Sequence, residues 1–161
     1  IDATCKSCAE MADAKIGALI VFENETLLGD IIASGTVVDA TPSKEIIGNI
    51  FYPKSPLHDG AMVIRGNRIY AAGCILPLTK NNNLSSQLGT RHRAALGLSE
   101  QSDAIVFVVS EERGEISCAV NGTLRRDIST GDMRDILTQQ YIPDSFSSDD
   151  KIISKLKRRF K

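Results

Sequence analysis

A chain of 161 residues with 42% apolar and 24% charged side chains has the size and composition of one soluble globular domain with a hydrophobic core. Its formal net charge of −1 excludes a global attraction to nucleic acid or acidic membranes, so any anion site must be local. The absence of tryptophan and an aromatic content of 5% argue against a stacking platform for single-stranded nucleic acid.

The N-terminal half contains a helical pattern followed by an apolar strand. Residues 2–15 predict a helix, and the uninterrupted apolar segment 18–22 predicts a strand that is covered on both faces. Cys5 and Cys8 have the spacing of a metal or redox pair, but no second pair follows and no strand precedes them. We therefore favour reduced thiols, with zinc or redox chemistry as the alternative.

The middle of the chain predicts a helix, a loop and a hairpin. Segment 27–33 is ambiguous, whereas Thr41 as N-cap and Pro42 at the first helical position predict a helix over 41–50. A proline-containing loop then leads to a β-hairpin. Its strands are predicted at 61–65 and 68–75.

The C-terminal half alternates helices with strands. We expect helices over 90–100 and 131–139, the second capped by Ser129, and a strand over 104–109 at the centre of the sheet. A second hairpin is predicted, joined by Asn121-Gly122; its strands are 115–120 and 123–128. The expected fold is mixed α/β (α+β): a twisted, mixed but largely antiparallel β-sheet flanked by helices.

The first candidate site is the loop His58-Asp59-Gly60-Ala61, which runs into a predicted strand. An Asp-Gly pair is a common turn, and a purely structural turn is the alternative. However, His58 beside Asp59 offers two metal ligands, and the small residues Gly60 and Ala61 leave space for a sugar or a phosphate.

The second candidate is Gly89-Thr90-Arg91-His92-Arg93, at the predicted start of a helix. Cations are unfavourable at a helix N-terminus unless an anion is bound there. The pattern therefore favours a phosphate ligand over a solvated helix face. Ser110-Glu111-Glu112 follows the predicted central strand and offers a hydroxyl for a phosphate and a carboxylate for a divalent ion; an acidic turn is the alternative.

Together these segments resemble the DGA and RHR signatures of the diadenylate cyclases, the DAC-domain enzymes, and most closely their membrane-anchored form. The likeness covers roughly 16–128. Its flanking matches are Ile16-Gly17-Ala18-Leu19-Ile20, Asn49-Ile50-Phe51, Pro56-Leu57, Leu76-Pro77-Leu78 and Val109-Ser110-Glu111-Glu112. No G-x-x-x-x-G-K-[ST] or G-x-G-x-x-G phosphate loop occurs, so a nucleotide would be bound by other means.

The resemblance implies that two ATP molecules are condensed into the second messenger cyclic di-AMP and two pyrophosphates, with Mn²⁺, Co²⁺ or Mg²⁺, across a face-to-face homodimer. It implies catalytic roles for Asp59, Gly60, Ala61, Arg91, His92 and Arg93. It implies metal ligation by His58, Asp59 and Glu112. It implies nucleotide binding by Leu76, which would pack on adenine, and by Gly89, Thr90, Arg91, Arg93, Ser110 and Glu111.

The resemblance and the composition together predict the organisation of the whole protein. Residues 1–142 would be the catalytic domain and 143–161 a polar tail with a basic end. Because the chain begins at Ile1, we expect a cytoplasmic domain whose membrane-anchoring helices are missing. We expect no nucleic-acid partner, and a regulatory protein is a further candidate partner. The alternative is a non-catalytic nucleotide-binding or regulatory domain of the same fold.

Overall fold

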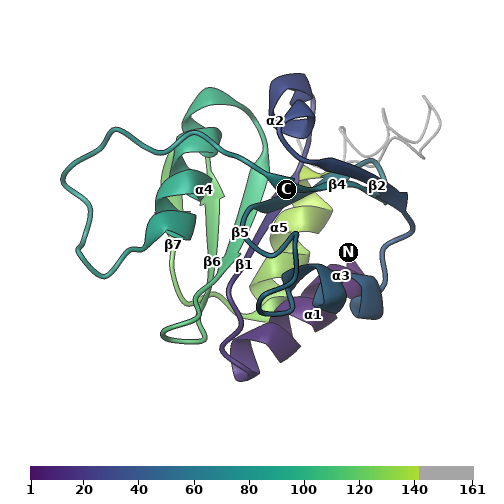
Figure 1. Cartoon of the computed structure of the whole chain (residues 1–161). Helices are drawn as coiled ribbons and strands as arrows, with labels where there is room; N and C mark the ends of the chain where they lie inside the picture. Colours follow the sequence, from purple (N-terminus) through teal and green to yellow (C-terminus); the bar gives the residue numbers. More distant parts are fainter. Residues whose placement is uncertain (142–161) are drawn as a thin grey trace.

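The computed structural model describes residues 1–141, which contain both helices and strands (Figure 1). The helices are α1 (Asp2–Asp13), α2 (Gly29–Ala33), α3 (Lys44–Phe51), α4 (Thr90–Gln101) and α5 (Thr130–Gln140). The strands are β1 (Ala18–Phe22), β2 (Thr36–Ala40), β3 (Ala61–Arg65), β4 (Arg68–Cys74), β5 (Ile105–Val109), β6 (Ile116–Val120) and β7 (Thr123–Arg125). The predicted tail at 143–161 lies outside the described residues.

The strands form one sheet in the order β2-β4-β3-β1-β5-β6-β7. Only the β1–β3 pair is parallel; every other neighbouring pair in the described sheet is antiparallel. This confirms the predicted mixed, largely antiparallel sheet and both predicted hairpins. The strand that we expected at the centre of the sheet, 104–109, corresponds to β5. The central position belongs to β1, and β5 lies beside it. Both strands are apolar and buried throughout, so hydrophobicity alone does not distinguish their order.

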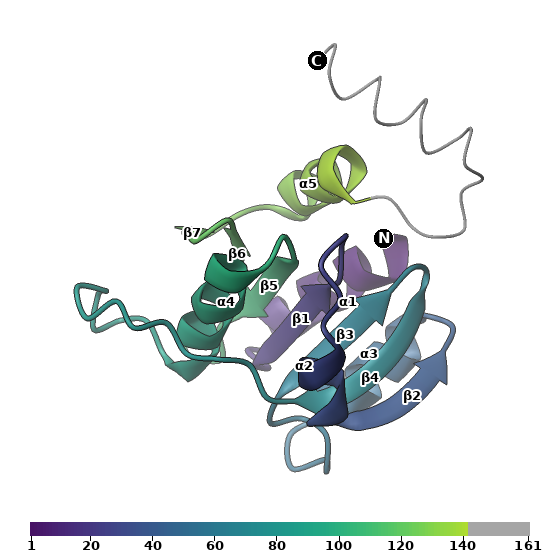
Figure 2. The ribbon, with the colours of Figure 1, turned by 90° about the horizontal axis from the view of Figure 1, so that it is seen from above.

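Helices cover both faces of the sheet because side chains alternate along each strand. In β1, Ile20 and Phe22 join one hydrophobic cluster, while Leu19 and Val21 join the other. The first cluster contains residues of α1, α3 and α5, and the second contains residues of α2 and α4. Figure 2 shows α2 and α4 in front of the sheet and α1 and α3 behind it. The burial of β1 on both faces, expected from its sequence, is confirmed.

Helix α1 brings both members of the Cys5-x-x-Cys8 pair into the core. Cys5 is 2% exposed and Cys8 is fully buried, and both thiols are free. Burial raises the pKa of the Cys8 thiol, so it is protonated at neutral pH. These cysteines pack as apolar side chains in the hydrophobic core.

Two local features differ from the expectation. Helix α3 begins at Lys44, not at Pro42, because the hydroxyl of Ser43 accepts the Ile46 amide proton at 3.1 Å and makes Ser43 the N-cap. The edge strand β2 was not predicted. Its residues are mostly exposed and its pairing with β4 contains a bulge, so it lacks the apolar pattern of a buried strand.

The segment that follows β4 packs closely along α4. The Thr79 amide donates to the Arg93 carbonyl at 3.0 Å, and a Cβ at Gly97 would lie 1.9 Å from the Pro77 carbonyl oxygen. Gly97 therefore allows the backbone at 77–78 to touch the helix. Within residues 1–141, no helix combines the length and the apolar content needed to cross a membrane.

We predict that Gly97→Ala destabilises the chain by about 1–3 kcal/mol, because backbone atoms cannot rotate away from the added methyl group. This cost exceeds the gain of about 1 kcal/mol in helix propensity. Gly48→Ala in α3 is the matched control, since a Cβ there meets no atom within 4 Å. Denaturant unfolding midpoints measure both changes, and a Gly97→Ala variant as stable as Gly48→Ala would contradict the proposed packing.

Candidate active site

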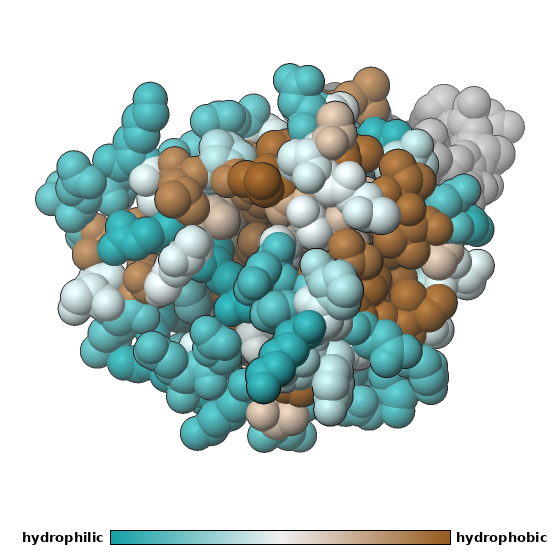
Figure 3. Space-filling view, in the orientation of Figure 1, coloured by the Kyte–Doolittle hydropathy of each residue, from teal (hydrophilic) through white to brown (hydrophobic). Residues whose placement is uncertain are grey.

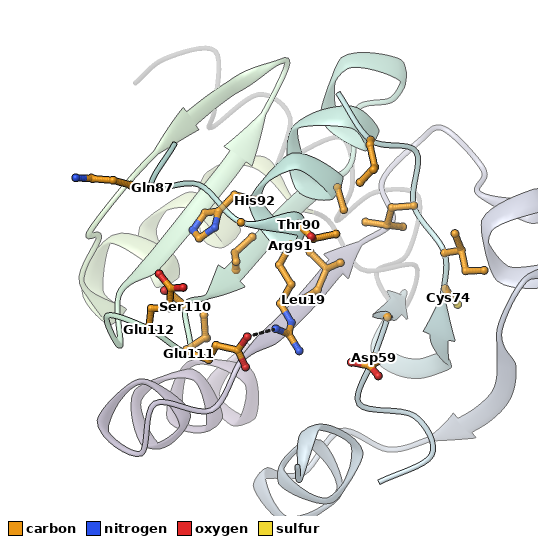
Figure 4. A pocket seen from close by; sticks show the side chains of 18 of the residues that line it. Leu19, Asp59, Cys74, Gln87, Thr90, Arg91, His92, Ser110, Glu111 and Glu112 are labelled. Atoms are coloured by element: carbon orange, nitrogen blue, oxygen red, sulfur yellow. Dashed lines mark ion pairs between the residues drawn. The ribbon is translucent and has the colours of Figure 1, made fainter. Parts of the chain in front are cut away.

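A cavity of about 660 Å³ opens between the first turn of α4, the C-terminal end of β5 and the loop that precedes β3 (Figure 4). Its volume falls within the roughly 300–1,000 Å³ of small-molecule sites. The apolar lining residues are Leu19, Cys74, Ile75, Leu76, Leu78, Ala94, Val108 and Val109. The other lining residues are Asp59, Gly60, Ser86, Gln87, Gly89, Thr90, Arg91, His92, Ser110, Glu111 and Glu112.

The apolar part of the lining suits a flat, apolar ring. Leu19 and Val108 come from the neighbouring strands β1 and β5, and Leu76 is 6% exposed. Burial raises the pKa of the Cys74 thiol to about 11, so this residue is a neutral part of the wall. At the rim, Ile75 and Leu78 are 71% and 53% exposed. In Figure 3, apolar surface borders hydrophilic surface on this face of the molecule.

The start of α4 provides an electropositive wall, as the sequence predicted. The helix begins at Thr90 with Gly89 as N-cap, and no side chain caps its first amides. The amide protons of the first turn have no intrahelical acceptor, and the helix dipole adds to their positive potential. Thr90 and Arg91 line the cavity at this point, so an anion there would meet amide, hydroxyl and guanidinium donors.

Residues after β5 face Arg91 across the cavity floor. The guanidinium of Arg91 lies 3.5 Å from the Glu111 carboxylate (Figure 4). Ser110 accepts the Arg113 amide proton at its hydroxyl oxygen, at 3.3 Å, and this leaves the hydroxyl proton free to donate. The turn thus presents one hydroxyl donor and one carboxylate that holds the guanidinium.

His92 is a buried, polar part of the wall. It is 6% exposed, and its Nε2 has no hydrogen-bond partner among the described residues. Burial is the main cause that lowers the pKa of His92 below its ordinary value, and the nearby positive charges of Arg126 and Arg91 act in the same direction, against Glu115. His92 is therefore a neutral imidazole at pH 7, and its Nε2 atom is buried without a hydrogen-bond partner among the described residues.

The loop before β3 holds Asp59 and His58 together. The Nδ1 atom of His58 lies 2.7 Å from the Ser55 carbonyl oxygen, which can only accept, so Nδ1 carries a proton. The other ring nitrogen, Nε2, lies 3.2 Å from Oδ1 of Asp59. A cation between these two atoms would bind both of them. The arrangement therefore fits either a proton or a divalent metal ion.

A metal ion at this pair would need further ligands. Among residues 1–141, no group of three or more His, Cys, Asp or Glu side chains gathers as a metal site. Glu112, the expected third ligand, lies across the cavity from Asp59 (Figure 4). One ion could contact all three only if the walls approached each other. Otherwise water and ligand oxygens would complete the coordination, as is usual for Mg²⁺.

The backbone places the Asp59 loop tightly against β4. Gly60 has φ +140, and a Cβ there would lie 2.8 Å from the carbonyl carbon of Gly73. Gly73 itself has φ +67. An L side chain at position 60 would be strained and would push the loop away from β4. The small residues of this turn are thus required by backbone packing as well as by any ligand.

The structure brings most of the expected residues to one cavity, with three exceptions. His58 does not line the cavity itself but contacts Asp59, which does. Ala61 is fully buried at the start of β3, and Arg93 does not line the cavity. Consecutive helical residues point about 100° apart, so Arg91, His92 and Arg93 cannot all face one ligand.

Several lining residues had no signal in the sequence. Ser86 and Gln87 come from the polar loop before α4, whose composition resembles any exposed loop. Arg126, from beyond β7, reaches Gln87 at 3.5 Å and Glu115 at 3.2 Å and so lies behind the cavity wall. Only the tertiary fold connects these positions. By contrast, Leu78 and Val109 belong to segments that the sequence had already singled out, and Ile75 is the last residue of the predicted hairpin.

Comparison with known proteins identifies the family. The family described as "DisA bacterial checkpoint controller nucleotide-binding" (DAC) matches residues 5–124. The chain is 43% identical over 141 residues to cyclic di-AMP synthase CdaA of Bacillus subtilis, covering 88% of this chain and 52% of that protein. It is 46% identical over 142 residues to a diadenylate cyclase of Listeria monocytogenes, with the same two coverages, 88% and 52%. The chain thus spans about half the length of these curated relatives.

Solved structures agree with this result. The crystal structure of a double mutant of DacA from Staphylococcus aureus matches with a TM-score of 0.85 and 48% identity, covering 87% of this chain and 93% of that one. The structure of a protein from Bacillus cereus, described as a hypothetical membrane spanning protein, matches with a TM-score of 0.76 and 45% identity, covering 79% and 62%. The chain therefore belongs to the DAC family of nucleotide-binding domains.

Proposed function

We propose that this chain is the catalytic domain of a diadenylate cyclase, which condenses two ATP molecules into cyclic di-AMP and two pyrophosphates. The observation that carries the proposal is the meeting, in one cavity, of an apolar wall, an uncapped helix N-terminus with Arg91, and the Asp59 carboxylate. The names of its relatives, cyclic di-AMP synthase and diadenylate cyclase, support it.

The two walls suit the two ends of ATP. Adenine packs against the apolar lining around Leu76 and Val108, and the triphosphate lies at the first turn of α4. There the helix amides, Thr90 and Arg91 donate to phosphate oxygens, and the Ser110 hydroxyl donates from the opposite side. Charge-assisted donors in a partly buried site stabilise the negative charge that develops in phosphoryl transfer.

In each transfer step, the ribose 3′-oxygen of one ATP attacks the α-phosphorus of the other. An O3′–P bond forms, the bond between the α-phosphorus and its bridging oxygen breaks, and pyrophosphate leaves. The Asp59 carboxylate, 83% exposed at the cavity mouth, is placed to accept the proton of the 3′-hydroxyl. Gly60 keeps that approach free of side chains.

Ring closure requires two cavities to face each other, because each 3′-oxygen must reach the other nucleotide. We therefore propose a face-to-face homodimer as the active form. The exposed apolar side chains of Ile75 and Leu78 at the cavity rim support this, since a partner would cover them. A dimer that forms only transiently is sufficient for turnover.

A divalent ion completes the proposed site. His58 and Asp59 would hold Mn²⁺ or Co²⁺, which accept imidazole more readily than Mg²⁺ does. Such an ion would neutralise phosphate charge and favour loss of the 3′-hydroxyl proton. In the longer protein, we propose that residues 1–142 form the cytoplasmic cyclase domain, anchored in the membrane by segments outside this chain. The description of the Bacillus cereus relative as membrane spanning supports that anchoring.

Incubation of the chain with ATP and Mn²⁺, Mg²⁺ or Co²⁺ over a range of protein concentrations tests the proposal. Mass spectrometry should detect cyclic di-AMP, formed at a rate per protomer that rises with protein concentration. Measurable ATP binding without product under every condition would contradict the proposal and favour a non-catalytic nucleotide-binding domain.

We predict that Asp59→Asn lowers the rate of cyclic di-AMP formation by about 100-fold or more, because an amide neither accepts the 3′-proton nor carries a charge for the metal. The thermal midpoint should stay close to that of the unmodified chain, since Asp59 is exposed. Asp13→Asn, which removes an exposed carboxylate at the end of α1, should keep full activity. An active Asp59→Asn variant would remove Asp59 from its assigned role.

We also predict that acidification destabilises the fold through His92. The folded state holds His92 with a lowered pKa, whereas the unfolded chain has the ordinary value of 6.5 and binds a proton more readily. Stability should therefore fall as the pH drops through about 6.5, by at most about 1.4 kcal/mol per pH unit from this residue. His92→Gln should show a shallower decline in thermal midpoint between about pH 7.5 and pH 5.5. Equal slopes would contradict the assignment.

A further inference from the structure

The guanidinium of Arg91 occupies the place where a side chain of residue 17 would stand. A Cβ built on Gly17 would lie 2.5 Å from Nη1, 2.7 Å from Cζ and 3.1 Å from Nη2 of Arg91. Real Cβ atoms essentially never approach another heavy atom within 3.0 Å. The guanidinium can therefore lie where it does only because residue 17 is a glycine.

The need for glycine is steric and not conformational. The φ angle of Gly17 lies outside the positive region that disfavours L residues, so alanine can adopt the same backbone. The atoms that alanine would meet belong to the far end of a flexible side chain. An added methyl group should therefore displace the Arg91 guanidinium and leave the fold intact.

The sheet places Gly17 and Glu111 on the same side of the cavity floor. Gly17 precedes β1 and Glu111 follows β5, and these strands pair in antiparallel register with Ala18 opposite Val109. The Glu111 carboxylate contacts Nη1 of Arg91 at 3.5 Å, and Figure 4 shows the two side chains pointing toward each other. The Arg91 guanidinium thus lies between the backbone of Gly17 and the carboxylate of Glu111.

We propose that Gly17 is a positioning residue for nucleotide binding: it seats the Arg91 guanidinium at the cavity floor, where it meets the phosphates of ATP. The inference rests on the proposed function, because it assumes that Arg91 binds the triphosphate. It adds a residue that touches neither the substrate nor the metal. The Arg91 side chain is only 23% exposed, so neighbouring atoms limit the other positions that a displaced guanidinium can take.

Calorimetric titration with 3′-deoxyadenosine triphosphate and with adenosine tests the inference. The deoxynucleotide lacks the attacking hydroxyl and is not consumed, and adenosine lacks the phosphates that Arg91 binds. Gly17→Ala should weaken triphosphate binding by roughly 10- to 100-fold, the usual effect of losing charge-assisted hydrogen bonds. Adenosine binding should not change. Gly48→Ala, in α3, is the matched control and should leave both affinities unchanged.

The double variant Gly17→Ala with Arg91→Ala separates positioning from a general disturbance. If Gly17 acts through Arg91, the double variant should bind the triphosphate as weakly as Arg91→Ala alone. Additive losses, an unchanged triphosphate affinity of Gly17→Ala, or an equal loss of adenosine binding would each overturn the inference. Failure of the unmodified chain to bind the triphosphate would instead overturn the proposed function.

Discussion

The antiparallel pairing of β1 with β5 is the constraint on which the site depends. It joins two strands that are buried on both faces, and its register sets Ala18 opposite Val109. The N-terminal end of β1 and the C-terminal end of β5 therefore lie together, and they carry part of the apolar cavity lining, Gly17 beneath Arg91, and the turn that contains Ser110. Helix α4 packs over this pair, and its N-terminus lies at the same end of the two strands. A rigid core thus positions flexible, charged side chains.

This arrangement suits a reaction that requires positioning and charge neutralisation more than covalent chemistry. The positive wall at α4 is costly without an anion, and the Glu111 carboxylate partly offsets that cost beside Arg91. The Asp59 loop approaches from β3, pressed against β4 by two glycines. The two walls come from opposite sides of the central strand, so the cavity spans the middle of the sheet. The apolar rim between them remains exposed in the single chain.

The sequence alone predicted the mixed sheet, both hairpins and helix α4, because their strands and helix have strong local patterning, whereas the two signature segments were assigned to a site with the help of a family resemblance. It missed β2, whose exposed residues lack a strand pattern, and it placed the start of α3 too early because Ser43 competes with Thr41 as a cap. The role of Gly17 depends on a contact with a residue 74 positions further along the chain (91 − 17), which no local pattern encodes. Arg91 and Arg93 lie in the same basic segment, and the turn of the helix between them explains why Arg91 lines the cavity and Arg93 does not.

The most direct test of the account is a crystal structure of this chain with Mn²⁺ and 3′-deoxyadenosine triphosphate, using the anomalous signal of manganese to locate the ion. We expect adenine against Leu76, phosphates at Thr90 and Arg91, and manganese beside His58 and Asp59. We also expect a second protomer whose bound nucleotide places its α-phosphate opposite the ribose of the first nucleotide. A nucleotide bound away from the first turn of α4, or a cavity that faces no second cavity, would contradict these expectations.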